Sequence, residues 1–399
     1  MVVPFARAQT GVATVSVPGT PQSLAYDSGK GEVFVIDLGA RGSVLSDATN
    51  TVVANLTLPA GSSPEGAIYD SGKGEVFVAD SGNAAVSVIS DSTNKVIANV
   101  GVGGTPDGLA YDSAKGEVFV ANGLDDTLSV ISDATNTVIA NVTLPTGSSP
   151  EGLAYDPAKS EVFVADNGAG NVSVVSDSTN GVVANVVTYG SPTGLAYDPA
   201  KGQVFVDNFG DGFAVISDAS NAVVANVVLP AGGSVGSVAY DSAKGDVIVG
   251  NYGSNTISAV SDSSDKIVAN VTVGSEPYDV AYDPGKGEIF VANSGNSTVS
   301  VVPDAALSST TSSSSSTSTT STPVSSTSTA TSAPTSSTAA SSVTSSSSTT
   351  AQTSTTSSTG GGGGVPEFPY QFFVAALFTV LLTATYLLVR RRTSFGRLE

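Results

Sequence analysis

The sequence contains no cysteine, no histidine and no tryptophan. Without cysteine there is no disulfide framework, and zinc sites built from cysteine and histidine are excluded as well. Without histidine there is no Ser-His-Asp triad. Because both cysteine and histidine are absent, only metals that take oxygen ligands remain open. Arginine is also scarce, because Arg41 is the only one between residues 8 and 389. The composition therefore predicts that the protein is not an enzyme and needs no cofactor, with Ca²⁺ as the one ion left to consider.

Positive charge is sparse over the first three quarters of the chain. Residues 1–305 carry 33 acidic and 11 basic side chains, a net charge of −22, whereas the remainder carries 2 and 4. An acidic domain repels phosphate backbones, so no nucleic-acid partner is predicted. Cations and basic partners are favoured instead.

What the sequence does have is a regular repeat, built on a tyrosine followed by an aspartate. Successive copies are 43, 42, 44, 42, 43 and 42 residues apart. A period of 40–45 residues is typical of a four-stranded propeller blade. The seven copies are at Tyr26, Tyr69, Tyr111, Tyr155, Tyr197, Tyr240 and Tyr282.

One copy, residues 106–144, shows how a blade is written. Four runs rich in β-branched and aromatic residues cover Gly108–Asp112, Glu117–Asn122, Thr127–Ile131 and Thr137–Leu144. Clusters of Asp, Asn, Gly and Ser separate the runs, which predicts four strands joined by tight turns. The turns after the first and third strands scarcely vary between copies, so their Asp and Lys residues are interpreted as scaffold.

The first and last copies complement each other. The seventh copy ends at Thr298–Val302 and has no fourth strand, while Val12–Asp27 aligns without a gap on Ile97–Asp112. Residues 12–17 therefore supply the missing strand and remove an open sheet edge. The prediction is an all-β, seven-bladed β-propeller of four-stranded antiparallel blades over residues 11–305, closed by the N-terminal strand.

Two segments carry a resemblance to a known family. EVFVADSGNAAVSVISDSTNKVIANV (residues 75–100) and EIFVANSGNSTVSVV (residues 288–302) resemble the YVTN-type β-propeller repeats of archaeal surface-layer and related cell-surface proteins. The family signature falls on Phe77–Asp80, with alanine in the place of threonine, and Ile248–Asn251 departs further from it. The resemblance implies a propeller at the cell surface and leaves its activity open.

The segments outside the repeats predict export and anchoring. Residues 1–10 are interpreted as the remnant of an export signal. Residues 306–364, mostly Ser, Thr and Gly, predict a disordered stalk, either O-glycosylated or unmodified.

The C-terminal segment, residues 365–399, predicts a membrane anchor. Its residues 370–389 are uncharged and long enough for one transmembrane helix. Arg390–Arg392 follow, which places the C-terminus in the cytoplasm and the propeller outside. Pro366–Phe368 before the helix resembles an archaeal PEF-type sorting signal, which implies removal of the helix; a retained single-pass anchor is the alternative.

Five sequons fit an exported glycoprotein. Three of them occupy one place in the fourth strand of their blades, where Asn-Val-Thr is also good strand sequence. The candidate glycosylation sites are Asn55, Asn141, Asn171, Asn270 and Asn296.

The connections before the first strand and between the second and third strands differ most between copies. In the propeller family these connections gather on one face around the channel, so their variation predicts that this face is the contact surface. Acidic residues enter the first strand in blades 2 to 4, and aromatic residues outside the repeat pattern occur in the other blades. This surface could hold a sugar, a basic peptide or a Ca²⁺-bridged partner, and the alternative is a solvated acidic rim. The candidate ligand-binding residues are Glu65, Asp107, Glu151, Tyr189, Phe209, Phe213, Tyr252 and Tyr278.

An Asp or Asn also ends the second strand of every blade, and together these residues form a ring. Its members Asp37, Asp80 and Asp166 are weak candidates for Ca²⁺ ligands, because they are carboxylates. Asparagine serves equally well in other blades, so the favoured interpretation is that each side chain caps its own loop.

Three functions are compatible with the sequence. The first is a stalked, membrane-anchored propeller that acts as a binding, adhesion or envelope module for a protein or glycan at the cell surface. The second is an extracellular propeller enzyme, a carboxylate-dependent glycosidase or a lactonase-like hydrolase, since two carboxylates suffice for glycoside hydrolysis. The third is an architectural envelope subunit without a discrete ligand.

Overall fold

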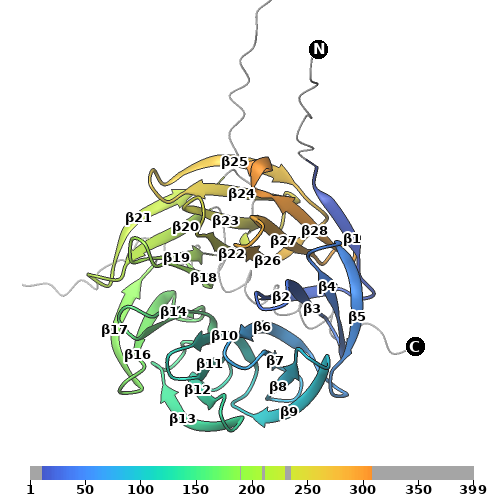
Figure 1. The fold of residues 1–399 in the computed structure, drawn as a ribbon. Helices are drawn as coiled ribbons and strands as arrows, with labels where there is room; N and C mark the ends of the chain where they lie inside the picture. Colours follow the sequence, from blue (N-terminus) through green and yellow to red (C-terminus); the bar gives the residue numbers. More distant parts are fainter. Residues whose placement is uncertain (1–10, 189, 209–211, 230–234, 308–399) are drawn as a thin grey trace, which may run out of the picture. The chain divides into compact units, whose positions relative to one another are not determined.

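A computed structural model describes residues 11–188, 190–208, 212–229 and 235–307 of the protein. These residues form seven four-stranded antiparallel sheets arranged as blades around a central channel (Figure 1). The first strand of each blade lines the channel and the fourth lies at the rim. The predicted seven-bladed propeller is confirmed.

Each blade is a meander of four consecutive strands, except that blade 7 takes its fourth strand from the N-terminus. Blades 1 to 3 consist of β2 (Pro21–Asp27), β3 (Glu32–Asp37), β4 (Arg41–Ser46), β5 (Thr51–Thr57); β6 (Pro64–Asp70), β7 (Glu75–Asp80), β8 (Ala85–Ser90), β9 (Lys95–Gly101); and β10 (Pro106–Asp112), β11 (Glu117–Asn122), β12 (Thr127–Ser132), β13 (Thr137–Thr143). Blades 4 and 5 consist of β14 (Pro150–Asp156), β15 (Glu161–Asp166), β16 (Asn171–Ser176), β17 (Gly181–Val187); and β18 (Pro192–Asp198), β19 (Gln203–Asn208), β20 (Gly212–Ser217), β21 (Ala222–Val228). Blades 6 and 7 consist of β22 (Val235–Asp241), β23 (Asp246–Asn251), β24 (Thr256–Ser261), β25 (Lys266–Thr272); and β26 (Pro277–Asp283), β27 (Glu288–Asn293), β28 (Thr298–Pro303), β1 (Ala13–Ser16).

The ring closes where β1 pairs with β28, as the alignment of the chain ends predicts. The register joins Ala13 to Val301 and Ser16 to Thr298, and the sheet order of blade 7 is β1-β28-β27-β26. Val15 and Val17 from the N-terminal segment enter the core between blades 7 and 1. Burial of each valine contributes about 1.5–2 kcal/mol to this closure.

The hydrophobic core lies between the blades. Seven clusters of buried side chains occur, one at each junction of neighbouring blades. A phenylalanine in the middle of the second strand anchors six of them, as Phe119 of β11 does against Val162 and Val164 of the next blade. Because each of these rings is fully buried, the junctions hold the blades in fixed relative positions.

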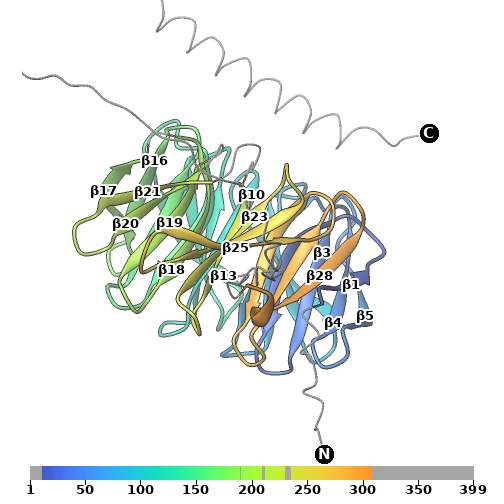
Figure 2. The same ribbon diagram turned by 90° about the horizontal axis from the view of Figure 1, so that it is seen from above.

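The two ends of the channel differ, and Figure 2 shows the ring from its side, with connections gathered at two opposite faces. We name as the belt face the one that carries the turns after the first and third strands. We name as the mouth face the one where each first strand begins and where the second-to-third loops lie. The antiparallel order of each blade fixes this division.

The belt face holds the repeated tyrosines. Each tyrosine donates a hydrogen bond from its hydroxyl to the aspartate of the turn after its own third strand; in blade 4, Tyr155 Oη lies 2.9 Å from Asp177 Oδ2. The lysine of the first turn then reaches the same aspartate of the following blade, as Lys115 Nζ does at 2.8 Å from Asp177 Oδ1. Lys286 of blade 7 completes the circle by pairing with Asp47 of blade 1 at 2.8 Å. The lysine side chains are about a third exposed, so each pair contributes under about 1 kcal/mol.

The propeller extends slightly beyond its predicted end. A short 3₁₀ helix, Asp304–Leu307, follows β28, and Leu307 packs into the core between blades 6 and 7. No helix among the described residues is long and apolar enough to cross a membrane. The predicted export remnant, stalk, sorting signal and transmembrane helix lie outside the described residues.

Candidate functional site

Three first strands approach each other closely at the mouth face. A Cβ atom on Gly66 would lie 2.4 Å from the carbonyl oxygen of Asp107, and one on Gly108 would lie 2.5 Å from that of Glu151. Only glycine fits such a backbone contact. A Cβ on Gly152 would likewise lie 2.3 Å from the carbonyl oxygen of Thr193. The residues just before these three glycines, Glu65, Asp107 and Glu151, therefore follow one another around the mouth, and we name them the acidic arc. All three are half-buried.

The loops around this arc are fixed by side chains of the preceding blade. Asp126, between β11 and β12, accepts hydrogen bonds from the amides of Gly147 at 2.7 Å and Ser149 at 2.8 Å. Asn255 accepts one from the amide of Glu276 at 2.9 Å in the same way between blades 6 and 7. The mouth is therefore a preorganised surface rather than a set of independent loops.

The predicted aromatic residues separate into different environments. Tyr252 and Tyr278 lie together, with ring centroids 6.4 Å apart in an edge-to-face arrangement. Phe213 is 2% exposed and packs edge-to-face on Phe205 in the core between blades 5 and 6, so its predicted role at the mouth is corrected. It occupies the β20 position that aliphatic residues such as Leu128 fill in other blades. Tyr189 and Phe209 lie outside the described residues.

The Asp/Asn ring at the ends of the second strands is buried, except for Asn208, which is half-buried. Asp80 accepts hydrogen bonds from Ser62 Oγ at 2.6 Å, the Ser63 amide at 3.0 Å and Asn83 Nδ2 at 2.9 Å. Burial raises the pKa of Asp37 to about 6, although the nearby charge of Arg41 lowers it. No three acidic side chains among the described residues are grouped to hold a metal ion. Only the bond from Asn83 lies in the second-to-third loop of Asp80 itself, and the other two come from the connection before β6, so the predicted loop cap describes Asp80 only in part.

In blades 3 and 4 this ring bonds to the third strand instead. Asn122 Nδ2 donates to Ser129 Oγ at 3.0 Å, and Ser129 Oγ donates to Asn141 Oδ1 of the fourth strand at 3.0 Å. In blade 4, Ser173 Oγ lies 2.5 Å from Asp166 Oδ2 and 2.9 Å from Asn185 Oδ1. Burial raises the pKa of Asp166 to about 6, opposed by its hydrogen bond to Ser173. The ring is therefore part of a buried polar network that crosses these blades.

The sequence analysis missed a cluster in the channel wall at blades 6, 7 and 1. Asp279, the third residue of β26, accepts hydrogen bonds from Ser237 Oγ and the Val280 amide on one oxygen, at 2.7 and 2.8 Å. Its other oxygen accepts from the Leu24 amide at 2.7 Å and Ser23 Oγ at 3.2 Å. Burial raises the pKa of Asp279, and the four hydrogen bonds oppose the rise. The available signal was the repeat itself, since blades 2 to 5 have glycine at this position.

A second buried acid departs from the repeat in blade 5. Asp207 stands in β19 where most blades have alanine, and burial raises its pKa to about 8. Thr193 Oγ1 donates to its Oδ2 at 2.6 Å, and this threonine itself replaces the acidic residue that blades 2 to 4 carry at this position. The two substitutions compensate each other.

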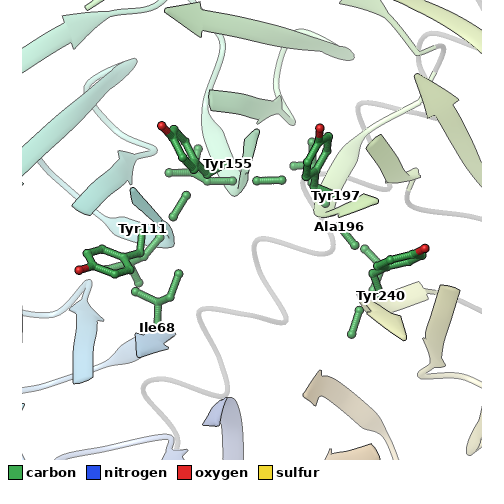
Figure 3. A pocket seen from close by; sticks show the side chains of 13 residues that line it. Ile68, Tyr111, Tyr155, Ala196, Tyr197 and Tyr240 are labelled. Carbon is green, nitrogen blue, oxygen red and sulfur yellow. The ribbon is translucent and has the colours of Figure 1, made fainter. Parts of the chain in front are cut away.

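A cavity of about 380 Å³ opens in the channel, and the first strands of blades 2 to 6 line it. Its wall consists of the fourth, fifth and sixth residues of the first strands, such as Leu109, Leu153 and Leu195. Figure 3 shows Tyr111, Tyr155, Tyr197 and Tyr240 with their hydroxyls directed away from the cavity, toward the blades. The cavity is therefore lined mainly by residues that recur in the repeat, and none of the described candidate ligand-binding residues lines it.

Three of the five sequon residues lie in fourth strands, at the rim. Asn55, Asn141 and Asn270 are exposed in β5, β13 and β25, while Asn296 is exposed between β27 and β28 and Asn171 is half-buried. The Oδ1 of Asn141 and Asn270 accepts from a serine of the third strand, and Asn185, which has no sequon, does the same. Asparagine thus has a structural role in this strand, and glycosylation stays a prediction.

Comparison with known proteins supports the propeller fold. The model of the YNCE-like beta-propeller family matches residues 104–302, just under half of the chain. A chain of hydrazine synthase from Kuenenia stuttgartiensis is similar in structure, with a TM-score of 0.65 at 15% identity, covering 75% of this chain and 99% of that one. A streptogramin B lyase gives 0.64 at 12% identity, covering 73% and 96%. No protein with a curated description matches. Since 1780 chains of solved structures match, the likeness specifies a fold rather than an activity.

The comparisons correct one prediction. Both structures are named for enzymes, so the conclusion that the chain is not an enzyme, drawn from its composition, is wrong as it stands. A fold shared with enzymes gives no ground for excluding catalysis. The surface-layer setting and the sorting segment remain predictions.

Proposed function

We propose that the protein displays its propeller at the cell surface and binds a positively charged partner, protein or glycan, across the mouth face. The observation that carries this proposal is the contrast between the two faces. The belt face repeats the same tyrosine, aspartate and lysine contacts around the ring, whereas the mouth face carries the acidic arc of blades 2 to 4 and the Tyr252–Tyr278 pair. A fixed scaffold with variation at one end is the usual design of a binding surface.

The setting of the proposal is an archaeal surface-layer-like envelope. Its support is the sequence: the YVTN-type repeats, the Ser/Thr-rich stalk, and the uncharged residues 370–389 followed by Arg390–Arg392. In this setting residues 365–399 act as a PEF-type sorting signal and membrane anchor, with the C-terminus cytoplasmic. The stalk would act as a spacer between the propeller and the membrane.

The test is a binding screen with the full chain in detergent against basic peptides and glycans. Binding should weaken as salt rises, because exposed charges are screened over about 10 Å at 0.1 M. Glu65→Gln, Asp107→Asn and Glu151→Gln should each weaken it, and the triple variant should weaken it most. Asp265→Asn is the matched control, since it removes one exposed charge from the belt face and introduces the residue that other blades carry there. Equal losses in the control and the mouth variants would refute the proposal.

A carboxylate-dependent hydrolase is the second candidate function. It is favoured by the two enzymes of the same fold and by the arc of carboxylates at the mouth. Paired carboxylates about 5–10 Å apart are enough to hydrolyse glycosides. Incubating the full chain with chromogenic glycosides and lactones tests it, and turnover that the triple mouth variant leaves unchanged would exclude these residues.

A further inference from the structure

We propose that Asp279 is an inner clasp of the propeller, which ties blade 7 to blade 6 and to blade 1 and completes the closure that β1 makes at the rim. The clasp does not depend on the proposed function. It consists of one carboxylate and two serines, Ser237 and Ser23, that the chain separates from it by 42 and 256 residues.

The geometry of the clasp uses both oxygens of the carboxylate. Oδ1 faces blade 6 and accepts from Ser237 Oγ at 2.7 Å, and Oδ2 faces blade 1 and accepts from the Leu24 amide at 2.7 Å. The Val280 amide, at 2.8 Å from Oδ1, fixes the side chain to its own strand, and Ser23 Oγ lies 3.2 Å from Oδ2. Hydrogen bonds to a charged acceptor are the strong ones, and here they cross two junctions at once.

The repeat shows that this arrangement is specific to the closing junctions. The same position is glycine in blades 2 to 5, and in blade 4 a Cβ on Gly152 would lie 2.3 Å from the carbonyl oxygen of Thr193. In blades 2 to 4 the first strand approaches the backbone of the next blade directly in this way, whereas the nearest atom to a Cβ on Gly194 of blade 5 would lie 3.7 Å away. Blades 6, 7 and 1 carry Ser237, Asp279 and Ser23 at this position, so side-chain hydrogen bonds join their first strands here. The close backbone approach between blades 6 and 7 falls one residue earlier, at Gly236, where a Cβ would lie 2.8 Å from the carbonyl oxygen of Pro277.

Only a carboxylate satisfies this set of donors. An asparagine at 279 would keep one acceptor oxygen and place an NH₂ group at the other position. That NH₂ would face either the Leu24 amide or the Val280 amide, and a backbone N–H cannot reverse its role. The serines, by contrast, can rotate and accept.

The experiment is hydrogen exchange on the full chain, read by blade. Asp279→Asn should raise exchange in β1 and β28 by about tenfold or more, because a buried donor is left unpaired at the junction they close. Exchange in blades 3 and 4 should stay at the wild-type rate. The matched control is Asp207→Asn, the same change at a buried acid bonded to Thr193 of its own blade, which should leave β1 and β28 unchanged.

Milder variants keep the test decisive should Asp279→Asn fail to fold. Ser23→Ala should raise exchange in β1 and β2, and Ser237→Ala should raise it in β22, each less than the asparagine variant does. Exchange at these strands equal to the wild type in both serine variants would overturn the clasp. So would a rise in Asp279→Asn that is the same in blades 3 and 4 as in blade 7.

Discussion

Asp166→Asn should stabilise the propeller, and more so as the pH rises. Ser173 Oγ carries one hydrogen but lies between two acceptors, 2.5 Å from Asp166 Oδ2 and 2.9 Å from Asn185 Oδ1. It can serve both only if Asp166 is protonated and donates to it. In blade 3 the asparagine at this position, Asn122, donates to its serine directly. The substitution therefore supplies permanently the donor that Asp166 provides only at low pH.

The magnitude follows from the pKa of Asp166. Burial raises this pKa from 3.8 to about 6, so between these values the folded state binds a proton that the unfolded state has lost. Stability falls as the pH rises through this window, by at most about 3 kcal/mol at 1.36 kcal/mol per unit. The asparagine variant escapes this loss. We expect it to match the wild type near pH 4 and to gain about 1–3 kcal/mol at pH 7–8, or about 2–5 °C in melting temperature.

Scanning calorimetry of both proteins at pH 4, 6 and 8 measures this difference. Asp80→Asn is the matched control, because Asp80 accepts from three donors and an amide would turn its NH₂ toward one of them. It should cost about 1–3 kcal/mol. The reasoning is refuted if the two variants shift stability in the same direction, or if the gain in Asp166→Asn is as large at pH 4 as at pH 8.

The remaining predictions concern the whole ring. The melting temperature of the wild type should fall between pH 5 and pH 8.5. Burial raises the pKa of Asp37 to about 6 and that of Asp207 to about 8, and a carboxyl whose pKa is raised in the folded state makes the protein less stable as the pH rises. A flat profile in calorimetry would contradict this. Val15→Asp should cost more than about 3 kcal/mol and expose the N-terminal segment to limited proteolysis, since it buries an unpaired charge where the ring closes. Lys286→Ala should cost under about 1 kcal/mol in thermal unfolding, and the difference should shrink in 1 M salt.

The strands and the closure could be predicted because both are local properties of the repeat. Alternating β-branched residues and turn signals give each strand within a residue or two, and the alignment of residues 12–27 on 97–112 identifies the missing strand. The burial of Phe213 could also have been predicted, since the repeat aligns it with Leu128. It was missed because an aromatic residue that departs from the repeat pattern was interpreted as part of the contact surface.

The clasp and the cavity depend on distances around the ring, which a repeat does not encode. Ser23 and Asp279 are 256 residues apart and meet only because the ring has seven blades and closes at this junction. The cavity depends on the width of the channel. The sequence shows glycine at the third position of four first strands, but it does not show why glycine is needed there. In blades 2 to 4 a carbonyl oxygen of the next blade would lie less than 3 Å from any Cβ placed at this position.

Departures from the repeat fall into two kinds. Asp279 with its serines and Asp207 with Thr193 are each accompanied by a second departure that supplies a hydrogen-bond partner. Such paired departures serve the fold, because an unpaired buried carboxyl would cost several kcal/mol. The acidic arc of Glu65, Asp107 and Glu151 is half-buried at the mouth, where a partner can reach it. The internal comparison that a repeat protein contains thus identifies residues retained for closure, and it marks the acidic arc as the residues that the proposed function would use for binding.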